Sequence, residues 1–415
     1  MDKSEAETQV SMVAGLTATW YPHPDEIAPD KWDALIDGVA GGTPFLRHAW
    51  LSALHRTGCA SPQTGWHPRF LALENARGEI EAACPLYLKD HSWGEYVFDW
   101  AWADAYDQQL ATDGQGYYPK LVSAVPFSPI TGPRLLVQPH WQGAGRQARM
   151  ARLLSEIADQ CERHQWSSAH ALFLPEDEAR LAGEQGWLVR HGVQFHWQNR
   201  EGQPYADFDD FLAGMQHDKR KKIKQERRKV REAGITFQVR DGQQITESDW
   251  DFFYRCYAQT YLERRQTPYL SRLFWQEVAQ AMPECWALIV ASDLHGVPLA
   301  CALLAVDRQQ GAVYGRYWGA VQTVSCLHFE TCYYQPLQWC IEQGLLRFEG
   351  GAQGEHKLAR GLLPVSTYSA HWLAHEGFRD AVARFLKRED SGMHAYLNEL
   401  DERAPFKTLS PAPTL

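Results

Sequence analysis

The sequence predicts an α/β protein with mixed sheets, in which one arrangement of helices and strands is built twice. The chain has 415 residues, of which 45% are hydrophobic, and this is enough for two cores. Short apolar runs bounded by turn residues alternate with segments of helical spacing. The order helices, antiparallel hairpin, strand, loop, helix, strand occurs once in each half. We therefore predict two domains, 1–199 and 200–415, with a cleft between them.

The first half contains apolar runs that predict strands and two amphipathic segments that predict helices. The runs 68–75 and 79–89 are separated by turn residues and predict a hairpin. The other predicted strands are 96–106, 133–138, 167–175 and 187–199. The predicted helices are 146–161 and 176–186, the second ended by Gly186.

The second half opens with one long predicted helix, 205–234, which Gly234 ends. A strand at 235–240 and a helical segment at 248–282 follow. A second hairpin is predicted at 285–307, with its turn at His295-Gly296. The remaining elements are a strand at 310–320, a helix at 327–344 and a strand at 345–351.

Charge is distributed unevenly along the chain. The formal net charge of −10 argues against a protein that binds nucleic acid over its whole surface. Between Lys219 and Arg231, however, nine Lys and Arg residues stand against one Glu. A cationic helix of this kind is either a solvated face or a surface that follows phosphates, as in tRNA or a nucleotide-linked acceptor.

Cysteine usage and hydropathy indicate a cytoplasmic protein without a structural metal. The nine cysteines show no CxxC pair and no zinc spacing, so no metal site is predicted. The first twenty residues lack the basic and apolar regions of a signal peptide. The longest apolar runs are too short for a membrane span. The sequence leaves the oligomeric state open.

The segment 350–371, GGAQGEHKLARGLLPVSTYSAH, follows the last predicted strand. Its glycines, Gly354 among them, allow positive φ angles and close backbone approach, which suits a ligand loop better than a core. Lys357 and Arg360 would share one face of a helical turn and would hold a phosphate or carboxylate. The alternative is that both are solvated or paired with nearby glutamates. Tyr368 is a candidate hydrogen-bond donor.

Several stretches resemble the FemAB-like family of predicted N-acyltransferases, the peptidoglycan biosynthesis and recognition type. These stretches are 97–106, 117–136, 194–199, 314–320, 327–335 and 350–372. The resemblance implies two tandem GNAT acyltransferase domains. It also implies transfer of an acyl or aminoacyl group to a primary amine, with aminoacyl-tRNA or acyl-CoA as the donor and no permanently bound cofactor. The basic helix is similar to the one that opens the second GNAT domain of Fem-type transferases, which use aminoacyl-tRNA.

The sequence departs from the usual CoA-binding loop, Q/R-x-x-G-x-G/A, at both places where it would occur. The first half has the partial match QGAGRQ at 142–147, and the second half has VQTVSCLHF at 321–329, without glycine. This departure lowers the expectation of ordinary CoA binding at a helix N-terminus and leaves a modified acyl-CoA site open.

Candidate chemistry gathers where the helix 327–344 begins, which in a GNAT sheet faces the acyl site. Glu330, His328 and His356 are candidates for the general base. Glu330 is otherwise a helix N-terminal acid, and His328 is otherwise a structural histidine. The predicted donor-binding and substrate-binding residues of the second half are Tyr314, Arg316, Tyr317, Tyr333, Gly354, Lys357 and Arg360, with Tyr368.

The first half offers Asp104, Tyr118 and Lys120 as candidates for the acceptor side of the predicted cleft. Packing of one domain on the other would explain these residues equally well. The competing function for the whole chain is a GNAT module that binds a peptidoglycan precursor or another amine ligand and catalyses nothing.

Overall fold

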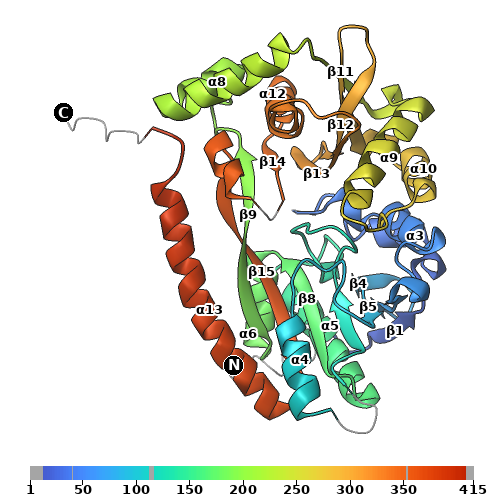
Figure 1. The fold of residues 1–415 in the computed structure, drawn as a ribbon. Coiled ribbons are helices and arrows are strands. Elements are labelled where there is room, and N and C mark those ends of the chain that lie inside the picture. Colours follow the sequence, from blue (N-terminus) through green and yellow to red (C-terminus); the bar gives the residue numbers. More distant parts are fainter. Residues whose placement is uncertain (1–12, 40, 112–115, 352–353, 408–415) are drawn as a thin grey trace. The chain divides into compact units, whose positions relative to one another are not determined.

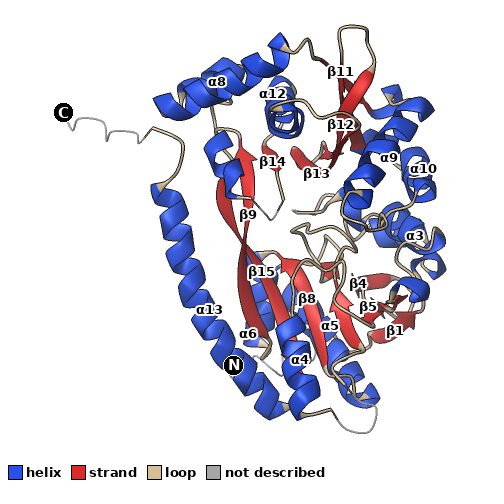
Figure 2. Cartoon of the chain, in the orientation of Figure 1, coloured by secondary structure: helices blue, strands red, loops and turns tan. Residues whose placement is uncertain are grey.

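The computed structural model describes residues 13–39, 41–111, 116–351 and 354–407 (Figure 1). It is a mixed α/β structure with two sheets, so the predicted fold class is confirmed (Figure 2). The chain forms two compact units. Unit 1 contains the described residues of Met1–Gly192, Tyr269–Val278 and Ser366–Met393, and unit 2 those of Val193–Pro268, Ala279–Val365 and His394–Leu415. The division into domains 1–199 and 200–415 stays a prediction.

Unit 1 contains a four-stranded antiparallel sheet in the order β1-β3-β4-β7. The predicted hairpin is present as the pair β3–β4, with Leu71 opposite Cys84. The strands are β1 (Thr17–Tyr21), β3 (Phe70–Glu74), β4 (Ile80–Cys84) and β7 (Leu136–Val137).

Unit 1 also contains strands of the second sheet, in the order β15-β8-β6-β5-β2. β6 and β8 are parallel, whereas β8 runs antiparallel to β15. These strands place Lys120, His170 and His371 in the buried interior. Their bounds are β2 (Trp66–Pro68), β5 (Tyr87–Lys89), β6 (Lys120–Ser123), β8 (Ser168–Leu174) and β15 (Leu363–Leu373).

The helices of unit 1 include α5, whose buried face carries Met150, Leu153 and Ile157 against the sheets. Its apolar positions recur at helical spacing, as predicted. The helices of this unit are α2 (Pro29–Asp33), α3 (His48–Arg56), α4 (Trp100–Gln109), α5 (Gly143–His164) and α6 (Glu176–Glu184), with the short 3₁₀ turns η1 (Pro24–Glu26), η2 (Pro44–Leu46) and η3 (Pro62–Thr64).

Unit 2 is built on strands in the order β10-β11-β12-β13-β14-β9, of which β9 belongs to this unit from Val193 onward. The predicted hairpin is the pair β11–β12; β13 runs antiparallel to β12 and parallel to β14. The bounds are β9 (Leu188–Gln198), β10 (Thr236–Asp241), β11 (Trp286–Ser292), β12 (Pro298–Asp307), β13 (Ala312–Ala320) and β14 (Arg347–Glu349).

The helix between β13 and β14 is continuous from Leu327 to Glu342 but changes its winding along its length. It begins as α11 (Leu327–Phe329), continues as the π-helical segment η6 (Glu330–Tyr334) and ends as α12 (Gln335–Glu342). The other helices of unit 2 are α7 (Phe208–Ala213), α8 (His217–Glu232), α9 (Glu247–Leu262), η4 (Gly242–Gln244), η5 (Pro283–Cys285) and η7 (Glu355–Arg360). Two helices, α10 (Arg272–Ala281) and α13 (Glu376–Glu402), contain residues of both units.

The predicted strand 96–106 is wrong, because most of it is helix α4. Phe98, Trp100 and Trp102 alternate with polar or small residues and imitate the period of a strand. In the structure Trp102 is buried, whereas Trp100 is exposed and its ring stacks on Phe98 at a centroid distance of 4.4 Å. The aromatic alternation therefore combines two exposed residues with one on the buried side of a helix, and it does not mark a sheet face.

Two predicted helices are each divided in two. The segment 205–234 breaks between α7 and α8, where Gln216 donates its backbone N–H to Pro405 O and Lys407 donates to Gly214 O. This extended contact replaces the helical hydrogen bonds. The segment 248–282 is divided into α9 and α10 by a turn that contains Pro268, which disfavours helix in the residue before it.

The segment 350–371 contributes to the core, contrary to expectation. Leu358 and Leu362 are buried in the unit 2 core, and β15 takes up the second part of the segment. Ala352 and Gln353 lie outside the described residues, as do most of the residues considered for a signal peptide. Within the described ranges, no helix combines the length and the apolar character needed to cross a bilayer.

Candidate functional site

The parallel strands β13 and β14 of unit 2 pair along all of β14 but only at the beginning of β13. The register runs from Ala312 opposite Arg347 to Tyr314 opposite Glu349, where β14 ends. On its other side, β13 has a register shift that leaves Arg316 as an extra residue between Gly315 and Tyr317. Beyond Tyr314 one edge of β13 is therefore free of β14, and the bulge re-aims the side chain of Arg316.

Arg316 and Lys357 both border Gly351, just beyond the end of β14. Arg316 Nη1 donates to Glu349 O at 2.7 Å, and Nη2 lies 3.2 Å from Glu349 Oε2. Lys357 Nζ donates to Gly351 O at 3.1 Å. Burial, together with the charge of Arg316, lowers the pKa of Lys357 to about 8. The site thus holds two cations, of which only Arg316 has a carboxylate partner among the described residues.

The turn η7 that carries Lys357 begins at Gly354, whose φ is 102°. A Cβ atom at Gly354 would lie 2.4 Å from His356 Cε1, so a side chain here would displace the histidine ring. Glycine is therefore required twice, by the backbone angle and by the space. The positive φ angle expected of this glycine is present, and its role in ligand binding stays a prediction.

Two histidines and a tyrosine form a ring cluster beside this turn. His356 Nε2 lies 3.1 Å from Tyr333 OH, and the ring of His328 lies 5.7 Å from that of Tyr333 and 6.3 Å from that of His356. The π-helical winding of η6 positions Tyr333 on this side of the helix. The three predicted residues are thus brought together.

Both imidazoles of this cluster are kept neutral near pH 7. Burial, and then the charge of His356, lowers the pKa of His328 to about 4. Burial, and then the charges of Arg360 and Lys357, lowers the pKa of His356. A neutral imidazole has a lone pair that can accept a proton, which is the requirement for a general base.

Glu330 has different surroundings from Lys357. Its Oε1 accepts hydrogen bonds from Arg227 Nε at 3.0 Å and Gln335 Nε2 at 2.7 Å, and its side chain is buried. It lines a groove along α8 whose lining residues do not include Lys357. This groove is therefore not the single hollow that the sequence predicted for Glu330 and Lys357 together.

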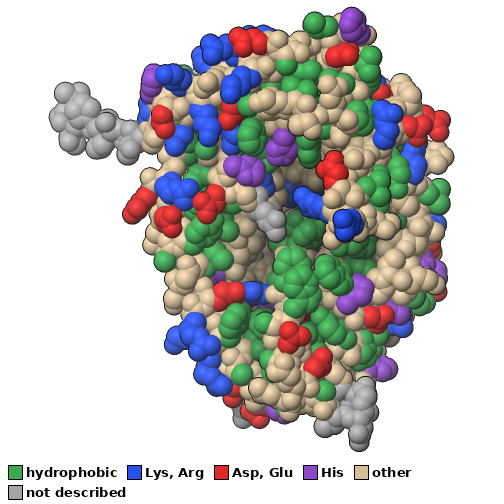
Figure 3. All heavy atoms as spheres, in the orientation of Figure 1, with side chains coloured by type: hydrophobic (Ala, Val, Ile, Leu, Met, Phe, Trp, Pro, Cys, Tyr) green, Lys and Arg blue, Asp and Glu red, His purple; other side chains and the backbone are tan. Residues whose placement is uncertain are grey.

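The groove that Glu330 lines has a volume of about 1330 Å³ and lies between α8 and α12. Acidic residues on both sides, Glu330 and Glu342 among them, reduce its positive charge without cancelling it. Figure 3 shows Lys and Arg side chains gathered over α8, at the upper left of the displayed face. The cations that line the groove are Arg220, Lys221, Lys224, Arg227, Arg228 and Arg231.

Arg360 is buried and paired with a carboxylate inside unit 2, and its role in donor binding stays a prediction. Its Nη2 lies 3.1 and 3.0 Å from the two oxygens of Glu226, which also accepts a hydrogen bond from Tyr334 OH. Its guanidinium lies 3.5 Å from the centroid of the Phe329 ring. This buried pair joins α8 to η7, and no sequence pattern signals it because Glu226 and Arg360 are far apart in the chain.

The two predicted tyrosines of β13 are buried in unit 2. Tyr314 is fully buried. Tyr317 packs with its ring against Phe253 and Tyr257 of α9. Their roles in donor binding stay predictions.

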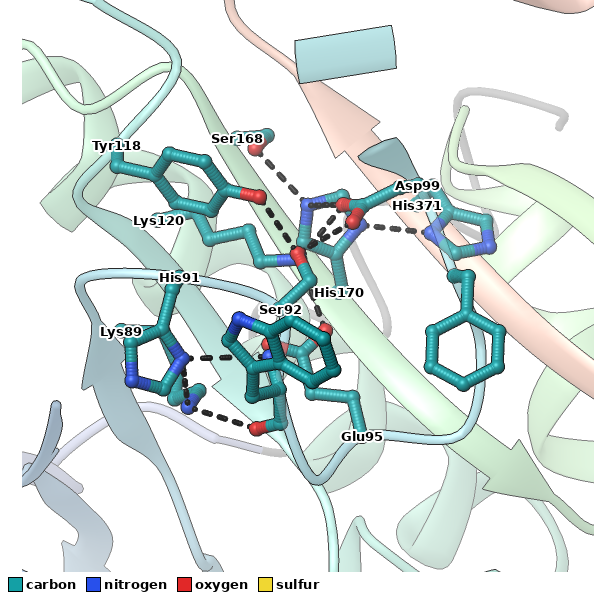
Figure 4. Close-up of polar contacts among 12 residues, drawn as sticks. Lys89, His91, Ser92, Glu95, Asp99, Tyr118, Lys120, Ser168, His170 and His371 are labelled. Carbon is teal, nitrogen blue, oxygen red and sulfur yellow. Dashed lines mark hydrogen bonds and ion pairs between the residues drawn. The ribbon is translucent and has the colours of Figure 1, made fainter. Parts of the chain in front are cut away.

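In unit 1, Lys120 is the centre of a buried network (Figure 4). Its Nζ lies 2.8 Å from Glu95 Oε2, 2.6 Å from Asp99 Oδ2 and 2.8 Å from Ser92 Oγ. Tyr118 joins this network through its hydroxyl, 2.8 Å from Ser92 Oγ. Lys120 and Tyr118 are thus brought together as predicted, whereas Glu95 was missed.

Two further predicted residues of unit 1 lie apart from this network. Asp104 is exposed on α4. Tyr368 lies on β15 with its ring 5.3 Å from that of His191. Neither is in contact with Lys120 in the described structure, so their binding roles stay predictions.

One group among the described residues has the composition of a metal site. A ring nitrogen of His23, one of His55 and a carboxylate oxygen of Asp25 lie within 4.8 Å of one another. The two imidazoles are stacked with an angle of 5° between their planes, so their lone pairs do not converge on one point. The group is therefore unsuited to holding an ion as it stands.

The family model described as peptidoglycan biosynthesis/recognition, FemAB-like, matches residues 23–408. The chain belongs to the FemAB-like family. The resemblance seen in the sequence is thereby confirmed, and membership supports a role in acyl or aminoacyl transfer. No curated protein matches the chain.

Solved structures of similar fold share little sequence with this FemAB-like protein. L-PGS from Bacillus licheniformis has a TM-score of 0.50 at 12% identity, covering 86% of this chain and 97% of that one. A conserved protein of unknown function from Bacteroides thetaiotaomicron has a TM-score of 0.50 at 8% identity, covering 86% and 100%. A tandem GNAT protein from the clavulanic acid biosynthesis pathway has a TM-score of 0.43 at 12% identity, covering 86% and 99%. At these identities the likeness concerns the fold alone.

Proposed function

We propose that this FemAB-like protein transfers an acyl or aminoacyl group to a primary amine. The observation that carries the proposal is the end of the β13–β14 pairing at Tyr314, next to which lie a neutral His356 and the cations Arg316 and Lys357. N-acyl transfer requires a base for the amine and positive charge for the oxyanion or the donor. Both kinds of group are present within one unit.

The proposed step uses His356 as the base. The amine nitrogen attacks the donor carbonyl carbon and its proton passes to His356 Nε2, next to Tyr333 OH. The bond from that carbon to the ester oxygen or thioester sulfur then breaks, and the leaving group receives the proton. Lys357, with Arg316, would stabilise the negative charge that develops on the carbonyl oxygen.

Aminoacyl-tRNA is the donor that the groove along α8 favours. Its cations would neutralise phosphates, and the usual CoA loop is absent from the sequence. We therefore propose that the donor is a co-substrate and that no cofactor is bound permanently. The family's description supports a peptidoglycan precursor, or another small molecule with a primary amine, as the acceptor.

The donor is tested with the double variant Lys221→Glu, Lys224→Glu. Because each phosphate contact contributes to the salt dependence of binding, we expect weaker tRNA binding and a salt slope smaller by about 2. Filter binding at several salt concentrations measures both quantities. Lys387→Glu on α13 is the matched control. Unchanged affinity and slope would exclude the groove as the tRNA surface.

The reaction is tested by incubating the protein with charged tRNA or acyl-CoA and a panel of primary amines. We expect donor consumption that depends on the amine, with the acylated amine detected by mass spectrometry. His356→Ala should lower turnover by roughly 100-fold or more, because general bases contribute about that much. The control is His295→Gln, an exposed turn residue. Amine binding without any donor consumption would instead establish a binding module.

A further inference from the structure

The buried network of unit 1 places one ammonium group between two carboxyl groups (Figure 4). Lys120, Glu95 and Asp99 have exposed fractions of 0, 2 and 3%. Charges this deeply buried weaken the fold unless they are compensated, and one ammonium compensates only one carboxylate. The second carboxyl group therefore has a strong reason to hold a proton or to bind a cation.

The two carboxyl groups accept different numbers of hydrogen bonds from the protein. Asp99 accepts hydrogen bonds from Ser92 Oγ at 2.5 Å and Tyr117 OH at 2.6 Å, in addition to Lys120 Nζ. Glu95 accepts only from Lys120, and its Oε1 is buried without a hydrogen-bond partner among the described residues. Hydrogen bonds to the charged form keep Asp99 ionised, so Glu95 is the member that binds the proton.

A chain of hydrogen bonds leads from Asp99 to a second unpartnered atom. Tyr117 OH lies 3.2 Å from His170 Nε2, and His170 Nδ1 lies 2.7 Å from His371 Nδ1. One of the two Nδ1 atoms must donate to the other, so the tautomers of the two rings are coupled. His371 Nε2 ends the chain, buried and without a partner in the described part of the protein. The chain holds Tyr117 as a donor to Asp99.

The groups that face Glu95 come from every neighbouring element. Lys89 lies on β5, Lys120 on β6 and Asp99 before α4, with His170 on β8 and His371 on β15 beyond Asp99. Burial raises the pKa of Glu95 to about 7, with the charge of Asp99 acting in the same direction and those of Lys120 and Lys89 against it. For Asp99, burial acts upward, but the charges of Lys120 and His170 lower its pKa overall.

We propose that unit 1 contains a second acid–base site, in which Glu95 exchanges a proton with a primary-amine substrate while Asp99 stays ionised against Lys120. This proposal rests on the proposed function for the nature of the substrate. In the step, the substrate ammonium loses one N–H bond and Glu95 Oε1 gains one O–H bond. An uncharged amine and a protonated Glu95 result, and the proton later returns to solvent.

The segment that carries Glu95 also presents exposed aromatic side chains. Residues 90–98 have no regular secondary structure, and Tyr96 has a φ of 63°. Trp93 is 52% exposed, and its ring lies 5.2 Å from that of Trp100. Exposed aromatic rings bind ammonium groups through their faces, so this surface suits the initial binding of an amine.

The test is infrared spectroscopy of the full protein as a function of pH, comparing wild type with Glu95→Gln. The difference should contain a protonated-carboxyl band that is present below pH 7 and disappears above it. The comparison is needed because burial also raises the pKa of Glu178 to about 7. Asp99→Asn provides a second variant: it removes a neighbouring negative charge, so the band should vanish at lower pH. A difference spectrum with no such band would overturn the proposal.

The amine is tested with ethanolamine at the pH where the band is half formed. In the proposed step the bound ammonium gives a proton to Glu95, so the band should strengthen in wild type. Tetramethylammonium has the same charge but no proton to give, so it should not strengthen the band. An unchanged band with ethanolamine would overturn the amine assignment. This readout requires no acyl donor, so it stays decisive even if the proposed transfer reaction fails.

Discussion

Tyr333 and His356 form the polar contact on which the proposed acyl-transfer step depends. Tyr333→Phe keeps the ring packing and removes the hydroxyl that lies 3.1 Å from His356 Nε2. A neutral base works above its pKa, so turnover should fall as pH drops through the pKa of His356, which lies below its ordinary 6.5. We expect Tyr333→Phe to lower kcat by about tenfold and to change the pH at which kcat falls on the acid side of its profile, the acid limb. A pH profile of kcat measures both effects, and an unmoved limb would contradict the assignment.

Lys89 is a buried amine that weakens the fold near neutral pH. Burial, opposed by the charge of Glu95, lowers its pKa from 10.5 to about 7, and its Nζ lies 3.6 Å from the centroid of the Trp66 ring. Between pH 7 and 10.5 the unfolded chain binds this proton and the folded protein does not. The linkage relation then makes stability rise with pH over that window, by up to about 1.4 kcal/mol per pH unit.

We therefore expect Lys89→Met to remove this rise and to stabilise the protein at pH 7. Urea unfolding of wild type and variant across the window measures the difference in free energy. Lys31→Met, at an exposed lysine, is the control and should keep the wild-type slope. A slope that persists in Lys89→Met would show that another group is responsible.

At the scale of elements, the pair Glu226–Arg360 determines how α8 and η7 are held together. Arg360→Met would leave the buried carboxylate of Glu226 without its cation, and we expect a loss of about 3–5 kcal/mol in the free energy of unfolding. The double variant Glu226→Gln, Arg360→Met should recover part of this loss, because no charge is left buried. Urea unfolding measures both. Arg403→Met, at an exposed pair with Glu355, should change little.

The elements that were predicted well are those whose apolar residues are buried. β11 and β12 are continuous apolar runs that are buried along almost their whole length, and α5 has one buried face with helical spacing. The strand predicted at 96–106 failed because exposed aromatic residues imitated a buried pattern. The single helix predicted at 205–234 failed for another reason. The break between α7 and α8 depends on the contact of Gly214 and Gln216 with residues 405–407. A local pattern contains no information about such a distant partner.

At the scale of the whole molecule, the two units are assembled from interleaved segments. Unit 1 takes Ser366–Met393 from the end of the chain, and β15 in that segment pairs with β8. A fragment 1–199 would lack this strand and would expose the edge of β8. We expect this fragment to show no cooperative thermal transition by itself and to regain one when produced together with 200–415. Circular dichroism during heating measures the transition, and cooperative unfolding of the fragment alone would support the predicted domain boundary.

The candidate site likewise depends partly on a local sequence motif and partly on contacts with residues that are distant in the chain. Gly354, His356 and Lys357 stand in one short motif, and this motif carries part of the resemblance to the family. The partners of these residues come from elsewhere in unit 2, as Tyr333 and Arg316 do. Glu330 was predicted from its place near a helix start, but the winding of the helix turns it toward Arg227 and α8.

The sequence by itself determined the α/β class, the family, the basic helix and the motif that carries the histidine and lysine of the site. These properties can be inferred from local spacing and composition. Burial on one face imposes a period on the apolar residues, and a tight turn requires glycine. Only the tertiary structure decided which charges meet. Glu226 with Arg360, and Lys120 with both Glu95 and Asp99, are joined across long separations in the chain. Such pairs form because a buried charge needs a partner, and the fold alone fixes which partner is within reach.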